Sequence, residues 1–217
     1  MPADYQGRRA DVTANDAVNP IPLLAAALRL TAVPTAVAVS RMFVRHTLSR
    51  WQMEEQTDTA ALIMSELVTN AVRASGITET EPKSWQITAE HVIGIQLRAL
   101  EASLFVEVWD RSEGEPVKKN PTLEATSGRG LLLVDALAKR WNIYRSPVGG
   151  KVVWAELPLG VPVESPPFDQ DHAPLILHPS IRAPRGPVED QARTALFEHL
   201  METTASVAAA SRGNDAI

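Results

Sequence analysis

The sequence predicts an α+β protein, a two-layer α/β sandwich in which a mostly antiparallel sheet carries its helices on one face. Helical periodicity comes first along the chain, and strand alternation follows it. Two of the alternating runs are joined by a link of only three residues, which indicates an antiparallel hairpin. The 217 residues, 45% of them hydrophobic, suffice for one domain of ordinary size with an appendage.

The N-terminal part of the chain leads into a first helix. Residues 1–22 are polar and poor in large apolar groups, so we expect a disordered segment. Residues 23–33 fit either a short helix or an edge strand, and the pattern does not choose between them. A helix over 35–51 follows Pro34 and carries apolar residues at helical spacing, with basic residues between them.

A second helix is predicted over residues 57–74. Thr57 or Asp58 is its expected N-cap, because a side-chain oxygen there accepts a hydrogen bond from a free backbone N–H. The pair Ser75-Gly76 ends the helix, since glycine is common just after a helical C-terminus.

Strands dominate the next part of the chain. "VIGIQLRA" (92–99) and "SLFVEVWD" (103–110) form the predicted hairpin. Residues 111–130 show little pattern, and a loop of that length in a compact domain is usually functional or disordered. "LLLVDALAKRW" (131–141) predicts a helix. "NIYRS" and "KVVWAELPL" (151–159) predict two last strands around a "PVGG" turn.

The composition changes after Pro158. Seven of the sixteen prolines fall between 161 and 187, which predicts an extended Pro-rich linker over 160–187. Helical spacing returns afterwards, so a C-terminal helix and tail are expected over 188–217, docked either on a partner or on the chain's own domain. The main domain then spans 23–159.

Charge and cysteine content narrow the classes of function. A net charge of −5 disfavours a nucleic-acid-binding protein, whose footprint would be a basic patch. The absence of cysteine excludes disulfides and thiolate zinc sites. The apolar run "IPLLAAALRL" (21–30) is too short to cross a bilayer and lies too far into the chain for a signal peptide. We therefore expect a cytoplasmic protein with no membrane partner.

One polar stripe runs along the second helix. At about 100° per residue, Glu66, Asn70 and Arg73 lie on one side, with Leu62 and Ile63 beside them. An ordinary solvated face is the alternative, but such a face is usually polar at many positions. A partly buried carboxylate needs a partner or a role. Glu66 can polarise a water, Asn70 can supply an oxygen ligand to Mg²⁺, and Arg73 can offset phosphate charge.

Asp110 stands at the end of the hairpin's second strand, in "WDRSEGEP" (109–116). It either starts an Asx-turn or accepts a hydrogen bond from the exocyclic amine of a purine. An ionised carboxylate offers only acceptors, so it selects an amino group. Gly114 would let the backbone bend close to the ring.

Glycines 128 and 130 precede the helix over 131–141. Unpaired N–H groups at a helix start favour phosphate, although an ordinary glycine-containing helix start fits the same pattern. "GGK" (149–151) is not a P-loop, because Arg145 replaces the required earlier glycine and Val152 follows the lysine. No G-x-S-x-G motif is present, and the five histidines lack metal-ligand spacing.

Four segments in order resemble the Bergerat-fold (GHKL) ATPases: "SELVTNAV", "VWDRSEGEP", "GRGLLLVDALAKRW" and "GGKVVWAEL". The D-x-S-x-x-x-P and GRGL forms are similar to the anti-sigma-factor serine/threonine kinase branch of that superfamily. The resemblance covers about residues 28–159. It implies a histidine-kinase-like ATPase domain with the Bergerat ATP-binding fold, which has an ATP pocket between helices and an antiparallel sheet.

The resemblance also implies roles for individual residues. Glu66 would be the general base, Asn70 would hold Mg²⁺ at the phosphates, and Asp110 would bind the adenine amino group. Residues 111–127 would form the mobile ATP lid. Further ATP contacts would come from Arg73, Ser112, Gly114, Pro116, Gly128, Arg129, Gly130 and Leu131.

Two positions depart from the family pattern. Ala74-Ser75 stands where relatives often have His-Ala, and Val152 stands where they often have threonine. In related sites that hydroxyl supports the adenine-binding carboxylate. Its loss is expected to weaken ATP binding by about 0.5–1.5 kcal/mol, the usual net value of one hydrogen bond.

Three functions compete at this point. The resemblance implies a serine/threonine kinase that phosphorylates a small anti-sigma-factor antagonist, binds a sigma factor, and forms a homodimer. The alternative is a non-catalytic module that binds a protein partner and uses ATP structurally or not at all. A DNA-binding regulator would use Arg41, Arg45 and Arg50 of the first helix, but the net charge disfavours it.

Overall fold

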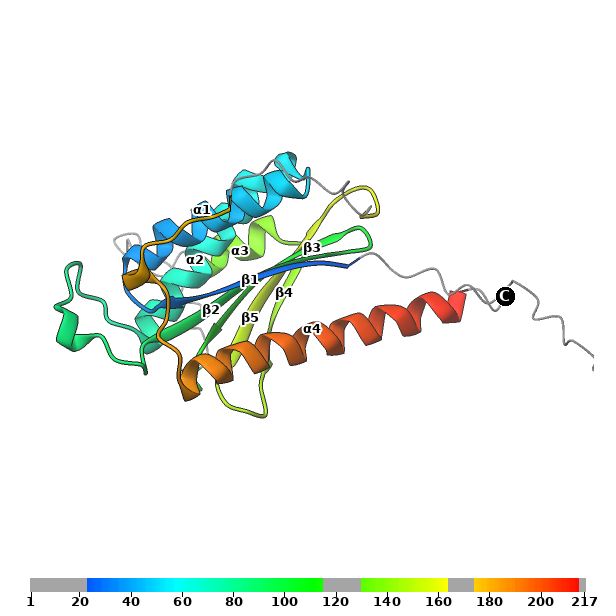
Figure 1. Ribbon diagram of the computed structural model, residues 1–217. Coiled ribbons are helices and arrows are strands. Elements are labelled where there is room, and N and C mark those ends of the chain that lie inside the picture. The colour runs from blue at the N-terminus through cyan, green and yellow to red at the C-terminus, as the bar shows by residue number, and fades with distance from the viewer. Residues whose placement is uncertain (1–22, 115–129, 164–173, 215–217) are drawn as a thin grey trace, which may run out of the picture.

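The computed structural model describes residues 23–114, 130–163 and 174–214 (Figure 1). Within them, five strands form one antiparallel sheet in the order β1-β2-β3-β5-β4. The strands are β1 (Leu23–Thr31), β2 (Val92–Leu100), β3 (Ser103–Asp110), β4 (Arg140–Arg145) and β5 (Lys151–Pro158). The α-helices are α1 (Thr35–Arg50), α2 (Thr57–Ser75), α3 (Gly130–Leu137) and α4 (Pro187–Asn214). The predicted α+β sandwich is confirmed, while the predicted disordered segment 1–22 lies outside the described residues.

The ambiguous segment at the start of the domain is the edge strand β1. It pairs with β2 from Leu23↔Leu100 to Thr31↔Val92. Its far end also meets the segment before α4, because Leu30 forms a bridge with Arg182 and the Ala183 N–H donates to the Arg29 carbonyl at 3.2 Å. Leu175, Leu177 and Ile181 of that segment pack against the main core. The described part of the predicted linker therefore runs along the domain.

Helices α1, α2 and α3 cover one side of the sheet, which we call the first face. Their apolar stripes and the inward residues of the strands form the main core, which includes Leu48, Met64, Val68, Leu97, Val108 and Val153. The predicted N-cap of α2 is wrong: the cap is Gln56, because a 3-10 turn over Glu54–Gln56 runs directly into the helix. Gly76 follows the helix as predicted, and a Cβ there would lie only 2.3 Å from the Ala32 carbonyl oxygen.

The third helix is shorter than predicted. It ends at Leu137 rather than near Trp141, because Arg140 and Trp141 pair with Glu156 and Ala155 as the start of β4. Lys139 and Arg140 also form ion pairs with Glu156. The apolar residues keep helical spacing beyond Leu137, but from Arg140 the backbone pairs with β5 and is a strand.

Helix α4 lies on the opposite side of the sheet, the second face (Figure 1). It packs in a separate apolar cluster made of Val92, Trp109, Val152, Val188, Ala192, Ala195 and Leu196. The C-terminal helix therefore docks on its own domain, one of the two outcomes that the sequence left open. Within the described residues, none of the helices combines the length and the apolar content needed to span a bilayer.

Candidate functional site

The first part of the candidate site lies between α2 and the start of α3. Glu66 and Asn70 are partly exposed on α2, whose opposite side is buried, and Arg73 is exposed. Gly130 opens α3 directly against Glu66, because a Cβ at residue 130 would lie 2.2 Å from Glu66 Oε2. A side chain at residue 130 would displace the Glu66 carboxylate from this position, so glycine lets that carboxylate lie at the mouth of the helix.

The start of α3 also provides a place for an anion. The first N–H groups of a helix have no partner within it and favour negative charge. Of the residues predicted here, Gly128 and Arg129 lie outside the described residues. Leu131 is described, and its side chain is buried in the main core. Any ligand contact from Leu131 must therefore come from its backbone.

The second part of the site is built on the ends of β3 and β5. Register pairs Asp110 with Lys151, and both side chains point to the first face. Lys151 Nζ donates to Asp110 Oδ1 at 2.7 Å, and both side chains are buried. Burial is the largest influence on Asp110 and raises its pKa, while Lys151 and the Ser112 amide oppose that rise. The pair is thus a buried acceptor next to a buried cation.

The backbone after Asp110 closes around the same lysine. The Ser112 N–H donates to Asp110 Oδ1 at 2.8 Å, and the Ser112 carbonyl accepts from Lys151 Nζ at 2.8 Å. The Gly114 N–H donates to Ser112 Oγ at 3.2 Å. An Asx-type turn is therefore present at Asp110, together with a buried ion pair that a simple turn would not require. Pro116 and most of the predicted lid lie outside the described residues.

Sequence reasoning missed Lys151 and Gly150. Gly150 has φ +74°, and a Cβ there would lie 2.5 Å from the Asp110 carbonyl oxygen. The signal in the sequence was "GGK", because a lysine that follows two glycines into a buried strand needs a carboxylate opposite it.

The interpretation of Val152 was wrong. A strand alternates its side chains, so when Lys151 faces Asp110 the next residue must point to the other side. Val152 is opposite Trp109 and lies in the α4 cluster on the second face. A threonine hydroxyl at residue 152 would therefore point away from Asp110. In this chain Lys151 makes the contact that supports the Asp110 carboxylate.

The two parts of the site share one face of the sheet. Helix α2 packs on β3 and on α3, so the stripe with Glu66 and the strand end with Asp110 lie on the same side. The structure brings Glu66 to Gly130, and it brings Asp110 to Lys151 and Ser112. That Glu66, Asn70 and Asp110 share one ligand stays a prediction.

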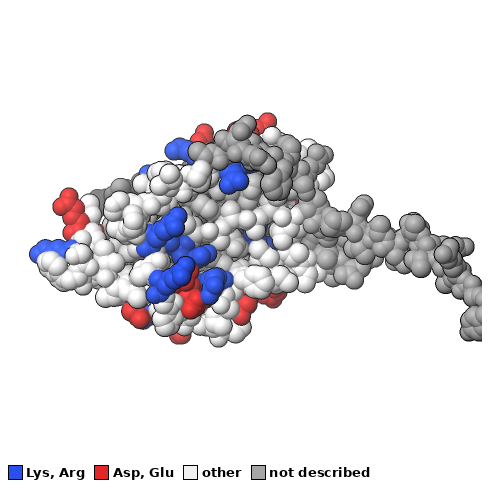
Figure 2. Space-filling view, viewed as in Figure 1, with Lys and Arg blue, Asp and Glu red and all other residues white. Residues whose placement is uncertain are grey.

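Surface charge is mixed rather than uniformly basic in the view of Figure 2. Lys and Arg atoms gather over β1 and the start of α4, with acidic atoms among them. Arg29 pairs with Glu189 at 2.8 Å, and Arg193 pairs with Asp190. These pairs reduce the positive charge that a nucleic-acid partner would need at this patch.

The fold and the two site groups define a class of protein: a nucleotide-binding α+β domain with a carboxylate at a helix mouth and a second, buried carboxylate at a strand end. The chain belongs to the histidine kinase-like ATPase domain family, whose model matches residues 30–156. Membership of this family supports ATP binding. No curated protein matches the chain. Helix α4 lies beyond the matched residues.

Proposed function

We propose that the protein is an ATP-binding serine/threonine kinase of the anti-sigma-factor type, acting on a small anti-sigma-factor antagonist. The observation that supports it most is Glu66 lying against Gly130 at the start of α3. A carboxylate next to unpaired helix N–H groups places a proton acceptor beside a phosphate-binding position. A sigma factor and the antagonist are the proposed protein partners, in the cytoplasm, with the chain as a homodimer.

The Asp110 group fits an adenine ring. Lys151 and the Ser112 amide both contact Oδ1, so an incoming amino group would bind Oδ2. A buried carboxylate that keeps its charge accepts from the amino group of adenine and repels the carbonyl oxygen of guanine. The position of Lys151 thus supports selection of adenine nucleotides.

The α2–α3 group fits the phosphates. When bound, Mg·ATP supplies the phosphoryl group that is transferred. Glu66 accepts the proton of the attacking serine or threonine hydroxyl, and the side-chain oxygen of Asn70 holds the Mg²⁺ ion. Arg73 and the N–H groups at the start of α3 offset the phosphate charge.

The test is phosphoryl transfer from labelled Mg·ATP to candidate antagonists. Glu66→Gln removes the proton acceptor, so transfer should fall by about 10²- to 10⁴-fold while Mg·ATP still binds. Glu54→Gln is a matched control on the exposed turn before α2. Equal transfer by the wild type and Glu66→Gln would contradict the proposed role of Glu66.

The second candidate is a non-catalytic module that binds a protein partner. The observation that favours it is the Asp110–Lys151 pair, because a buried carboxylate already neutralised by a lysine is stable without a nucleotide. The same assay separates the two functions. The module predicts partner binding with no transfer, and with Glu66→Gln indistinguishable from the wild type.

A further inference from the structure

Helix α4 is fitted closely to the second face of the sheet although it lies outside the family match. Its stripe of Val188, Ala192, Ala195 and Leu196 is buried against the strands. Gly94 makes room for it, because a Cβ there would lie 2.8 Å from Leu196 Cδ1. This close fit indicates a specific docked position rather than a loosely held tail.

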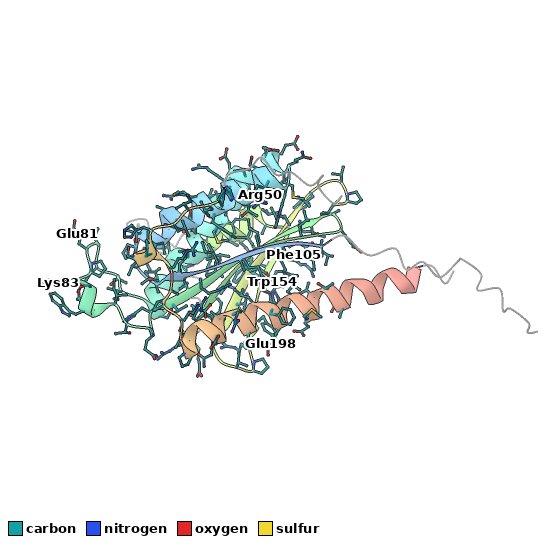
Figure 3. The ribbon with its side chains drawn as sticks, viewed as in Figure 1. Arg50, Glu81, Lys83, Phe105, Trp154 and Glu198 are labelled. Carbon is teal, nitrogen blue, oxygen red and sulfur yellow. The ribbon has the colours of Figure 1, made fainter. Side chains whose placement is uncertain are left out.

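Polar contacts fix the same position. His199 Nδ1 lies 2.7 Å from Glu107 Oε1, and the ring of His199 stacks on Tyr144 with centroids 5.0 Å apart. Trp154 and Phe105 also lie on the side of the sheet that faces α4, as Figure 3 shows, and Glu198 lies on the helix itself. Docking therefore has a set register along the helix.

The α4 cluster and the Asp110 group share one short piece of backbone. Trp109, fully buried under α4, immediately precedes Asp110 on β3. On β5, Val152 of the same cluster immediately follows Lys151. A shift of Trp109 and Val152 on the second face must therefore move the two charged residues on the first face.

The turn between β4 and β5 strengthens this link. Trp109 Nε1 donates to the Gly149 carbonyl at 3.2 Å, and a Cβ at Gly150 would lie 2.8 Å from the same indole ring. Helix α4 holds the turn from its other end, where Ser146 Oγ donates to Glu198 Oε2 at 2.9 Å. Lys151 leaves this turn directly for Asp110.

We propose that docking of α4 positions the Asp110–Lys151 pair for the nucleotide base, with Trp109 as the positioning residue. The proposal rests on the proposed ATP site and adds a regulatory element to it. A docked α4 and a bound nucleotide then stabilise each other, because coupling between two sites is reciprocal. Release of α4 should weaken Mg·ATP binding by about 5- to 150-fold, the usual range of such coupling.

The experiment compares two glutamate substitutions on α4 in the full chain. Ala192→Glu places a charge in the buried cluster, and Met201→Glu places the same charge on the exposed side of the helix. Calorimetric titration with Mg·ATP should show weaker binding for Ala192→Glu and wild-type binding for Met201→Glu. Equal affinity of the two variants would overturn the proposal. Gly94→Ala, a milder change under the same helix, provides the comparison where Ala192→Glu does not fold.

Amide hydrogen exchange in α4 separates coupling from a purely structural role, because a helix that is not coupled to the site would not respond to Mg·ATP. Mg·ATP should slow amide exchange in α4 of the wild type, although α4 lies on the opposite face from the site, and should not do so in Asp110→Asn. Unchanged α4 exchange in a wild type that binds Mg·ATP would overturn this inference and leave the proposed function intact. A wild type that binds no Mg·ATP would overturn both.

Discussion

Two buried ion pairs lie on opposite faces of the same sheet, and they are built differently. On the second face, Arg98 Nε donates to Glu107 Oε2 at 2.8 Å, and a second guanidinium nitrogen contacts Oε1 at 2.5 Å. His199 and Gln96 also reach the same carboxylate. On the first face, Lys151 meets Asp110 through one oxygen. Glu107 thus has partners on both carboxylate oxygens, whereas Lys151 contacts only one oxygen of Asp110.

The two pairs differ in the direction of their pKa shifts. Burial would raise the pKa of Glu107, but His199 and Arg98 outweigh it and lower the pKa to about 2. For Asp110 the balance is reversed, because burial outweighs Lys151 and raises the pKa. The Glu107–Arg98 pair is therefore the structural one, because the fold stabilises the charge of Glu107. Asp110 has its partners on Oδ1 alone, which leaves Oδ2 for a ligand's donor.

The largest expected effect is on stability at Glu107. Glu107→Gln leaves Arg98 buried without its counter-charge, so the free energy of unfolding should fall by about 3–5 kcal/mol. Denaturant unfolding measures it. Glu90→Gln, which removes the exposed partner of Arg111, is the matched control and should cost under about 1 kcal/mol. Similar losses of unfolding free energy in both variants would show that the Glu107–Arg98 pair does not stabilise the fold.

Acid should weaken the same pair. The folded pKa of Glu107 lies below its ordinary value of 4.5, so its contribution is present above about pH 4.5 and is lost as the pH falls towards 2. The loss should be about 3 kcal/mol. Plots of unfolding free energy against pH for the wild type and Glu107→Gln should therefore converge as the pH falls over this range. Parallel plots would contradict the lowered pKa of Glu107.

Lys151→Met should weaken nucleotide binding in addition to lowering the stability of the fold. Without the lysine, burial raises the pKa of Asp110 further. A protonated carboxyl is a weaker acceptor for an amino group, because it has lost its charge and one of its oxygens has become an O–H donor. Mg·ATP affinity at neutral pH should fall about tenfold and recover as the pH rises. Calorimetry across pH measures it, with the exposed Lys139→Met as control. A loss of Mg·ATP affinity that does not depend on pH would show that protonation of Asp110 is not its cause.

Val152→Thr should have the smallest effect on the nucleotide. Residue 152 faces α4, so the new hydroxyl cannot reach Asp110 and should not raise Mg·ATP affinity. Burying it without a partner should cost about 1–3 kcal/mol of stability. Val148→Thr on the exposed turn is the control. Tighter Mg·ATP binding by Val152→Thr would restore the interpretation based on family pattern.

Local pattern predicted the elements of the first face. Helical spacing located Glu66 and Asn70 on α2, and alternation located the β2–β3 hairpin that ends at Asp110. These features depend on residues close together in sequence, which is why a single sequence reveals them.

Contacts between distant segments were not predictable in this way. Lys151 meets Asp110 across 41 residues, and that contact depends on the register of β3 against β5. The docking of α4 depends on the space left by Gly94, which lies about a hundred residues before Leu196. Such contacts follow from the packed sheet and from no local spacing.

Titration of the wild type and Asp110→Asn with Mg·ATP tests the central claim most directly. The asparagine oxygen can still accept from Lys151 and the Ser112 amide, but the buried Lys151 loses its counter-charge, so stability should fall and binding is measured under conditions where unfolding curves show both proteins folded. The wild type should bind, and the variant should bind about 10- to 150-fold more weakly, as expected for a lost hydrogen bond to a charged group. Equal binding by both proteins, or binding by neither, would contradict an adenine site at Asp110.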